Sequence, residues 1–311
     1  MKKINFTRGL IVGPSGIGAV HLREFLRMGF NEIGFIGKSK FKKRTFNIST
    51  RNLKDIKIIN LQNFKNIKKF QPQVTSICSP FTQHENHILK CKNYSKFIIV
   101  EKPFIWSGKK LKKGKNFQIS SDILSKSNNT IVVNLPMISL AKQLIYKKEI
   151  PKNIKIFKFF YFTKGKQTYE NIAVDLLPHA LSFLLSILKK KTFNTKIIAI
   201  RKQKSKWSCR IKLDETLCIF QFKQDSAIRE SILNFDINNN QYKRFQENVN
   251  EERVNYLIKN KKKKLFLKNP MTDYLLYLIK NSKKTDKIKM NNNLVLKIIK
   301  IKEDLLAYNN F

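Results

Sequence analysis

The first 135 residues alternate short apolar runs with amphipathic stretches. Apolar runs of strand length fall at residues 10–12, 32–36, 57–60, 74–78, 97–100 and 130–133. The stretches at residues 17–28, 62–69, 83–92 and 118–126 separate them and favour helices. Strands that alternate with helices are typical of a parallel sheet with crossover connections. The pattern therefore predicts an α/β domain over residues 1–135.

The second half of the chain has a different pattern. Apolar and polar residues alternate with a period of two, and this predicts a largely antiparallel sheet with helices on one face. Strands are expected at 154–162, 196–201, 207–212, 216–222 and 231–237, and helices at 138–148, 175–189, 270–280 and 292–308. We therefore expect a second α/β domain over residues 136–311.

Composition excludes disorder and raises a question about charge. The 311 residues are 42% hydrophobic, and 63 Lys and Arg against 21 Asp and Glu give a net charge of +42. Such an excess suggests a nucleic-acid or anionic membrane partner. However, it is spread evenly over both halves, and only ten of the basic residues are Arg. We therefore favour biased composition and expect no specific nucleic-acid partner, so the run Lys261–Lys264 is interpreted as a solvated turn or helix face.

Cysteine spacing and hydropathy point to a cytoplasmic protein. Four cysteines at 78, 91, 209 and 218 show no C-x-x-C spacing and no paired His, so neither a metal site nor a disulfide framework is predicted. The most apolar long stretch, residues 172–188, contains Asp175, Pro178 and His179 and is shorter than the roughly 20 apolar residues of a membrane span. We expect no membrane span.

A glycine-rich turn follows the first predicted strand. Gly13-Pro-Ser15-Gly16-Ile17-Gly18 lies between that strand and a helix, where backbone N–H groups can approach a pyrophosphate closely. Ser15 stands where the dinucleotide fingerprint G-x-G-x-x-G has its middle glycine. The alternative is an ordinary strand-to-helix turn.

The end of the second predicted strand bears on cofactor choice. An NAD site usually has an acidic residue here, which binds the adenosine ribose hydroxyls. This chain has Lys38, Ser39 and Lys40 instead, which suit a 2′-phosphate. We therefore predict NAD(P) as cofactor, with NADP favoured over NAD, although a Lys can also fall here by chance in so Lys-rich a chain.

Two further motifs carry side chains suited to acid–base chemistry. Glu101-Lys102-Pro103 ends a buried strand, and an ammonium at the carboxyl end of a parallel strand can stabilise charge on a substrate oxygen. Asp175 and His179 lie one helical turn apart if Pro178 falls in the first turn, and an imidazole can take the proton from a hydroxyl as hydride leaves. The alternatives are a surface Lys, an N-capping Asp and a buried core His.

Taken in order, these signals resemble a known family. The glycine turn with His21 in the next helix, Ser79-Pro80 with His84, Glu101-Lys102-Pro103 and Asp175…His179 are together similar to the glucose–fructose oxidoreductase and inositol 2-dehydrogenase family (Gfo/Idh/MocA). The resemblance covers nearly the whole chain. It implies a dinucleotide-binding Rossmann domain over residues 1–135. It also implies an α/β domain with an open sheet over residues 136–311, which would bind substrate and form a homodimer or homotetramer. The expected activity is NAD(P)-dependent hydride transfer at a hydroxyl or keto carbon of a sugar, cyclitol or sugar derivative.

The resemblance also implies roles for individual residues. Lys102 would bind the reacting oxygen, His179 would be the general acid/base, and Asp175 would position substrate or His179. It further implies a cis bond before Pro103. The expected cofactor contacts are Gly13, Ser15, Gly16, Ile17, Gly18, Lys38, Ser39, Lys40, Ser79, Pro80, His84, Glu101 and Lys102.

Departures from the family pattern leave other functions open. Ser15 replaces a glycine, Pro136 stands where the family commonly has Arg, and the Gly-rich approach to Asp175 is missing. One alternative is a non-catalytic relative that acts as a ligand sensor or scaffold. The other is a nucleic-acid-associated basic protein, whose affinity would fall steeply with salt.

Overall fold

The computed structural model describes residues 6–38, 56–106, 113–126, 130–188, 190, 192–249 and 252–308. Their contacts divide the chain into two compact units. Unit 1 comprises Met1–Asn134 with Leu275–Leu296, and unit 2 comprises Leu135–Tyr274 with Lys297–Phe311. Residues 136–311 were all predicted to lie in the second domain, and of these, residues 275–296 group with the first unit.

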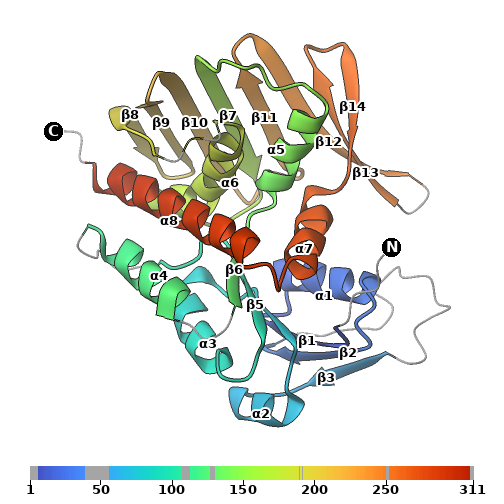
Figure 1. Ribbon diagram of the computed structural model, residues 1–311. Helices are drawn as coiled ribbons and strands as arrows, with labels where there is room; N and C mark the ends of the chain where they lie inside the picture. The colour runs from blue at the N-terminus through green and yellow to red at the C-terminus, as the bar shows by residue number, and fades with distance from the viewer. Residues whose placement is uncertain are drawn as a thin grey trace. The chain divides into compact units, whose positions relative to one another are not determined.

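Unit 1 is built on a six-stranded parallel sheet (Figure 1). Its strands are β1 (Arg8–Val12), β2 (Glu32–Ile36), β3 (Lys57–Asn60), β4 (Val74–Ile77), β5 (Phe97–Glu101) and β6 (Thr130–Asn134). The order is β3-β2-β1-β4-β5-β6, and all neighbours pair in parallel. This is the doubly wound Rossmann order, so the predicted parallel sheet is confirmed.

The order of this sheet reverses between β1 and β4, and that reversal locates a binding crevice. In the described part of the first 134 residues, the helical segments are α1 (Ile17–Arg27), η3 (Phe64–Asn66), α2 (Ile67–Phe70), η4 (Phe81–Gln83), α3 (His84–Cys91) and α4 (Lys115–Lys126). Right-handed crossovers place α1 and α3 on opposite faces of the sheet. Loops that follow β1 and β4 therefore border the crevice where α/β sheets of this type bind ligands.

Asn291 explains why a late segment belongs to unit 1. It lies on α8 (Thr285–Ala307), which begins seven residues before the predicted start and follows α7 (Pro270–Lys280). Asn291 Nδ2 donates to the Val133 carbonyl at 2.9 Å, and its Oδ1 accepts from the Val133 N–H at 3.0 Å. A fully buried edge strand needs such partners for its backbone, and an amide side chain supplies both.

Unit 2 contains an eight-stranded, mostly antiparallel sheet. Its strands are β7 (Ile156–Thr163), β8 (Thr195–Gln203), β9 (Lys206–Leu213), β10 (Thr216–Gln224), β11 (Ile232–Ile237), β12 (Asn240–Val249), β13 (Glu252–Lys259) and β14 (Lys263–Leu267). The order is β14-β13-β12-β11-β7-β10-β9-β8, and only the β7–β10 pair is parallel. The predicted α/β class with a largely antiparallel second sheet is confirmed.

Strands β12, β13 and β14 were not predicted from the sequence. Lysine, asparagine and glutamine interrupt the apolar alternation along these strands, because their exposed faces carry long polar side chains. The run Lys261–Lys264 was interpreted as a turn or helix face. Only its first half is a turn, since β14 begins at Lys263.

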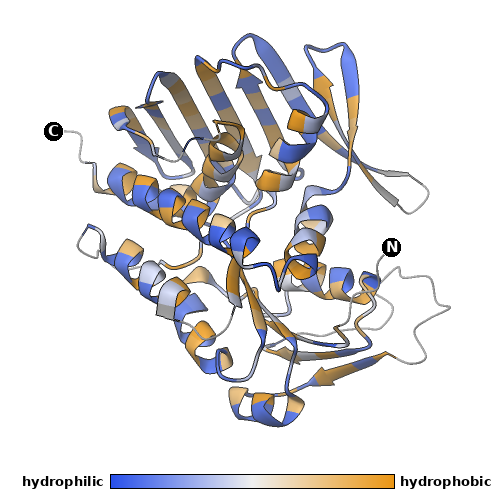
Figure 2. Ribbon diagram, in the orientation of Figure 1, coloured by the Kyte–Doolittle hydropathy of each residue, from blue (hydrophilic) through white to orange (hydrophobic). Residues whose placement is uncertain are grey.

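One face of this sheet is covered by α5 (Met137–Tyr146) and α6 (Glu170–Leu188), which pack against each other (Figure 1). Figure 2 shows the apolar character of both helices and of the strands beneath them. Phe183 of α6 stacks on Phe157 at a centroid distance of 5.7 Å and meets Phe235 at 4.9 Å. These rings form the core of unit 2, and aromatic pairs in such geometry stabilise beyond their buried area.

α6 differs from its prediction at its N-terminus. It begins at Glu170 rather than near residue 175, so Pro178 lies in the interior of the helix and Asp175 is not an N-cap. A proline there lacks the N–H of one helical hydrogen bond, and Pro178 and its neighbours on the helix are buried. α6 is long and apolar enough to cross a membrane by length and composition, yet 72% of its most apolar window is buried, as in a core helix.

Candidate functional site

The turn between β1 and α1 favours glycine over other residues at three positions, for different reasons. Gly13 and Gly16 have φ of +83° and +55°, in the left-handed region that favours glycine. A Cβ at Gly18 would lie 1.9 Å from the Gly13 carbonyl oxygen, where no side chain fits. The Ser15 carbonyl accepts a hydrogen bond from the Gly18 N–H at 3.0 Å, and the Ser15 side chain is exposed. The turn is therefore closed by its own backbone, without a glycine at 15.

This turn lies against the loop that follows β4. A Cβ on Gly13 would be 2.7 Å from the backbone nitrogen of Ser79, so the two loops are in contact at the sheet's reversal point. Gly37, after β2, packs against the Pro14 ring in the same way, with only 2.9 Å available for a Cβ. The glycine turn, the loop after β4 and Gly37 thus form a cradle in which, apart from the Pro14 ring, backbone lies directly against backbone. A dinucleotide pyrophosphate requires such a close approach of the backbone.

The predicted NADP-selecting residues are only partly covered by the described structure. Lys38 follows β2 and is exposed. Ser39 and Lys40 lie outside the described residues. Directly after β2 the structure describes only Gly37 and Lys38, and neither is acidic.

His84 links the loops after β4 and β5. Its Nε2 lies 2.9 Å from the Ser79 carbonyl oxygen, and its Nδ1 lies 3.0 Å from the carbonyl oxygens of both Pro103 and Phe104. Burial lowers the pKa of His84. Pro80 is exposed, while Ser79 is buried and its Oγ meets His87 Nδ1 at 2.8 Å. His84 is thus a tether for the loop that carries Lys102 rather than an open contact surface.

A buried ion pair between His21 and Glu101 lies next to the loop that carries Lys102. His21 Nε2 lies 2.8 Å from Glu101 Oε1, and Asn134 Nδ2 donates to the same oxygen at 2.5 Å. The other ring nitrogen of His21 lies 2.6 Å from Ser76 Oγ. Burial alone would lower the pKa of His21, but Cys78 and Glu101 beside the ring raise it to about 10. Burial opposes ionisation of Glu101 too, yet His21 and Asn134 hold its pKa below the usual range.

Glu101 was predicted as a cofactor contact, and the geometry gives it an internal partner. Four elements meet in this network: α1 with His21, β4 with Ser76, β5 with Glu101 and β6 with Asn134. Lys102 follows directly and is half-buried. The Lys102–Pro103 bond is cis, as the resemblance implied. The network anchors the end of β5, from which Lys102 extends.

In unit 2, Asp175 and His179 lie one turn apart on α6, and both are half-buried. The Asp175 carboxylate accepts a hydrogen bond of 2.5 Å from Gln224 Nε2, at the end of β10. The His179 ring meets Tyr161 of β7 edge to face, with centroids 5.3 Å apart. Asp175 and His179 therefore each contact a side chain of the sheet against which α6 packs.

Sequence reasoning missed several members of these clusters. Gln224, Tyr161 and Ser76 belong to no motif, and His21 was noted only for its place in the family pattern. Alternation along β10 and β7 could have placed Gln224 and Tyr161 on the buried face, but it carries no information about their partners across the sheet.

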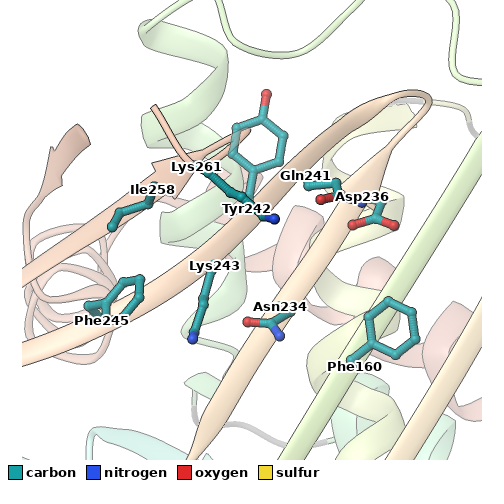
Figure 3. A pocket seen from close by; sticks show the side chains of 9 residues that line it. All are labelled: Phe160, Asn234, Asp236, Gln241, Tyr242, Lys243, Phe245, Ile258 and Lys261. Atoms are coloured by element: carbon teal, nitrogen blue, oxygen red, sulfur yellow. The ribbon is translucent and has the colours of Figure 1, made fainter. Parts of the chain in front are cut away.

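A separate cavity of about 580 Å³ lies on the sheet of unit 2 (Figure 3). It is lined from β7, β11, β12 and β13 by Phe160, Asn234, Asp236, Lys243, Phe245 and others. Phe157 and Phe159 pack on Phe183 of α6, so Phe160 faces the opposite side of the sheet. Asp236 is paired with Lys158 at 3.6 Å. None of the predicted site residues lines this cavity.

Comparison with known proteins decides the family of the first domain. Residues 7–119 match the GFO_IDH_MocA model, described as an oxidoreductase family with an NAD-binding Rossmann fold. These residues belong to that family. The glycine turn, Ser79, His84 and the Glu101-Lys102-Pro103 segment all lie in the matched region. The expectation of an NAD-dependent oxidoreductase of the Gfo/Idh/MocA family is thereby confirmed.

Solved structures show the same fold over the whole chain. A dehydrogenase (MviM) from Clostridium difficile has a TM-score of 0.66 and 11% identity, covering 97% of this chain and 99% of its own. The WlbA (WbpB) dehydrogenase from Thermus thermophilus was solved with NAD and UDP-GlcNAcA. It has a TM-score of 0.63 and 11% sequence identity, and the match covers 98% of this chain and 96% of its own. UDP-N-acetylglucosamine 3-dehydrogenase GnnA from Acidithiobacillus ferrooxidans has a TM-score of 0.64 and 8% sequence identity, and the match covers 96% of each chain. No curated protein sequence matches.

Proposed function

We propose that this protein transfers hydride between a nicotinamide dinucleotide and a hydroxyl or keto carbon of a sugar derivative. The observation that carries the proposal is the glycine turn, where backbone atoms of Gly13, Gly18 and Ser79 close a cradle that excludes side chains. The family match over the same residues supports this cradle as a dinucleotide site. A non-catalytic relative would not need the acid–base groups that the chain also carries.

The cradle fits the cofactor that the family implies. Gly16 has open space where its Cβ would be, so a ligand can approach its backbone at the start of α1. Gly13, Ser15, Gly16, Ile17 and Gly18 would surround the pyrophosphate. The bound nicotinamide would supply or accept the hydride. We propose NADP as the preferred form, because exposed Lys38 would attract a 2′-phosphate and no described neighbour is acidic.

Three side chains carry the proposed chemistry. Lys102, held by the anchored end of β5, binds the reacting oxygen and stabilises negative charge on it. His179 takes a proton from the hydroxyl during oxidation and returns it during reduction. Asp175 positions substrate or the His179 ring. These roles come from the family resemblance, and the half-buried state of all three residues supports them, since each combines access with a fixed setting.

We propose a nucleotide sugar as the substrate class. Two structures with the same fold are a dehydrogenase solved with UDP-GlcNAcA and a UDP-N-acetylglucosamine 3-dehydrogenase. The chain's charge of +42 would raise the local concentration of a diphosphate substrate. A substrate-binding second domain from residue 136, a homo-oligomer and a cytoplasmic location complete the proposal.

The first test is a titration with NADPH and NADH followed by nicotinamide fluorescence. About 150 mM salt screens nonspecific attraction to the basic surface beyond roughly 8 Å. We expect saturable binding of both, with NADPH tighter. Binding of neither would overturn the proposal, and tighter binding of NADH would overturn the NADP preference alone. Turnover would then be assayed with UDP-sugars and with the matching free sugars.

A further inference from the structure

The geometry points to Gln224 as a positioning residue that orients the Asp175 carboxylate. This inference rests on the proposed function, because Asp175 belongs to the proposed catalytic groups. Gln224 is the last residue of β10 and is only 5% exposed. Its Nε2 donates to Asp175 Oδ2 at 2.5 Å across 49 residues of sequence. A charge-assisted hydrogen bond of this length fixes a carboxylate more firmly than a neutral one would.

The orientation of the Gln224 amide is set by the backbone of the loop before α6. The Gln167 N–H donates to Gln224 Oε1 at 3.2 Å. Because a backbone N–H only donates, the atom that it meets must be the oxygen, and the nitrogen then faces Asp175. The reverse orientation would place two donors together on one side and two acceptors together on the other. Gln224 therefore can present only a donor to the carboxylate.

Gly165 in the same loop shows how tightly the amide is enclosed. A Cβ at this position would lie 2.7 Å from Gln224 Oε1 and 2.8 Å from its Cδ. Those atoms are the end of a flexible side chain, so an added methyl group would displace the amide rather than the backbone. Glycine at 165 thus leaves room for the amide in the position where it contacts Asp175, and the loop is linked to the carboxylate through this one side chain.

Sheet register explains why this position suits the task. Gln224 pairs with Thr163 in the parallel β7–β10 ladder, so the loop that leaves β7 passes beside the end of β10. The Asp225 N–H also donates to the Thr163 carbonyl at 3.3 Å, and the Gln224 N–H to the Ser205 carbonyl at 3.0 Å. Backbone contacts on both sides hold the residue while its side chain reaches α6.

Two variants test separately the chemistry of the Gln224 amide and its position. Gln224→Leu keeps the approximate volume and removes both hydrogen bonds, and Gly165→Ala leaves Gln224 chemically intact but displaces it. Gln221→Leu is the matched control, because Gln221 lies on the same strand but is exposed. We expect both test variants to lower kcat at least about tenfold with little change in the dissociation constant for NADPH, and the control to retain wild-type values.

A double-mutant cycle tests whether Gln224 acts through Asp175. The unfolding equilibrium constants of Gln224→Leu, Asp175→Ala and the double variant should show a coupling of at least about fivefold. In kinetics, Gln224→Leu should have no further effect on kcat once Asp175 is Ala, whereas a merely structural role would lower kcat in both backgrounds. If Gln224→Leu does not fold, Gly165→Ala takes its place in the cycle.

The outcomes distinguish this inference from the proposed function. Additive effects on unfolding would overturn the contact, and coupled unfolding with unchanged kcat would overturn its positioning role. If the wild-type protein turns over no sugar derivative, the proposed function fails, while the unfolding cycle, which needs no activity, still decides whether Gln224 holds Asp175.

Discussion

The imidazole of His21 and the carboxylate of Glu101 form an ion pair inside the Rossmann sheet, with 2.8 Å between Nε2 and Oε1 and both side chains at least 95% buried. Such a pair is costly to bury unless further hydrogen bonds satisfy it. Ser76 and Asn134 provide them at 2.6 and 2.5 Å. The pair therefore anchors the strand end that precedes Lys102.

This ion pair predicts a pH dependence of stability. The pKa of His21 is raised from 6.5 to about 10, so its contribution to the free energy of unfolding is complete below pH 6.5 and is lost as pH rises through 10. Glu101, with a lowered pKa, contributes above pH 4.5 and loses its contribution as pH falls. Between pH 6.5 and 10 we expect wild type to lose on the order of 4 kcal/mol relative to His21→Gln.

Urea denaturation of both proteins at several pH values measures this difference. Using the difference cancels the effect of the many lysines, which titrate alike in both chains. A constant difference from pH 6.5 to 10 would show that His21 is neutral in the folded protein.

Cofactor binding should depend on Gly18 far more than on Ser15. A methyl group at Gly18 would lie 1.9 Å from the Gly13 carbonyl oxygen, so Gly18→Ala must distort the turn. We expect NADPH to bind at least about tenfold more weakly. Ser15→Gly restores the family fingerprint and should stay within about threefold of wild type, because the turn already closes through the Ser15 carbonyl. Fluorescence titration tests both, and a large gain with Ser15→Gly would show that Ser15 impairs the site.

Removal of the His84 tether should destabilise unit 1. His84→Ala removes the ring that lies between the Ser79 carbonyl and those of Pro103 and Phe104, and it leaves a cavity. We expect a loss of about 2–4 kcal/mol in the free energy of unfolding. His87→Ala is the control, because His87 is half-buried and contacts the Ser79 hydroxyl without joining that loop to Pro103 and Phe104. Equal losses for the two variants would contradict the tether.

Lys102 should be required for turnover rather than for folding. Lys102→Met removes the ammonium and keeps the length of the side chain, so we expect kcat to fall by about 100-fold or more with the midpoint of denaturation nearly unchanged. Lys96→Met removes the same charge from an exposed position just before β5 and should retain full turnover. Full turnover by Lys102→Met would remove Lys102 from the mechanism.

The parts of the fold that were predictable depend on local sequence. Apolar runs of strand length gave the six strands of the first sheet, and the glycine turn was recognisable because positive φ and close packing select glycine regardless of what lies elsewhere. The boundaries of the elements and the strands with polar exposed faces were predicted less well. α6 begins before Asp175 rather than at it, since buried packing tolerates Pro178 inside the helix, and polar exposed faces concealed β12 to β14.

The sequence by itself determined the fold class, the order of the motifs and the types of side chain available for chemistry. Each of these follows from the order of residues and elements along the chain, without knowledge of which residues meet in space. Only the tertiary structure decided their partners. Gln224 meets Asp175, Glu101 meets His21, and Asn291 closes β6 across 49, 80 and 158 residues respectively. The order of the strands and the packing of helices on the sheets bring such residues together, and the local pattern of a single segment determines neither.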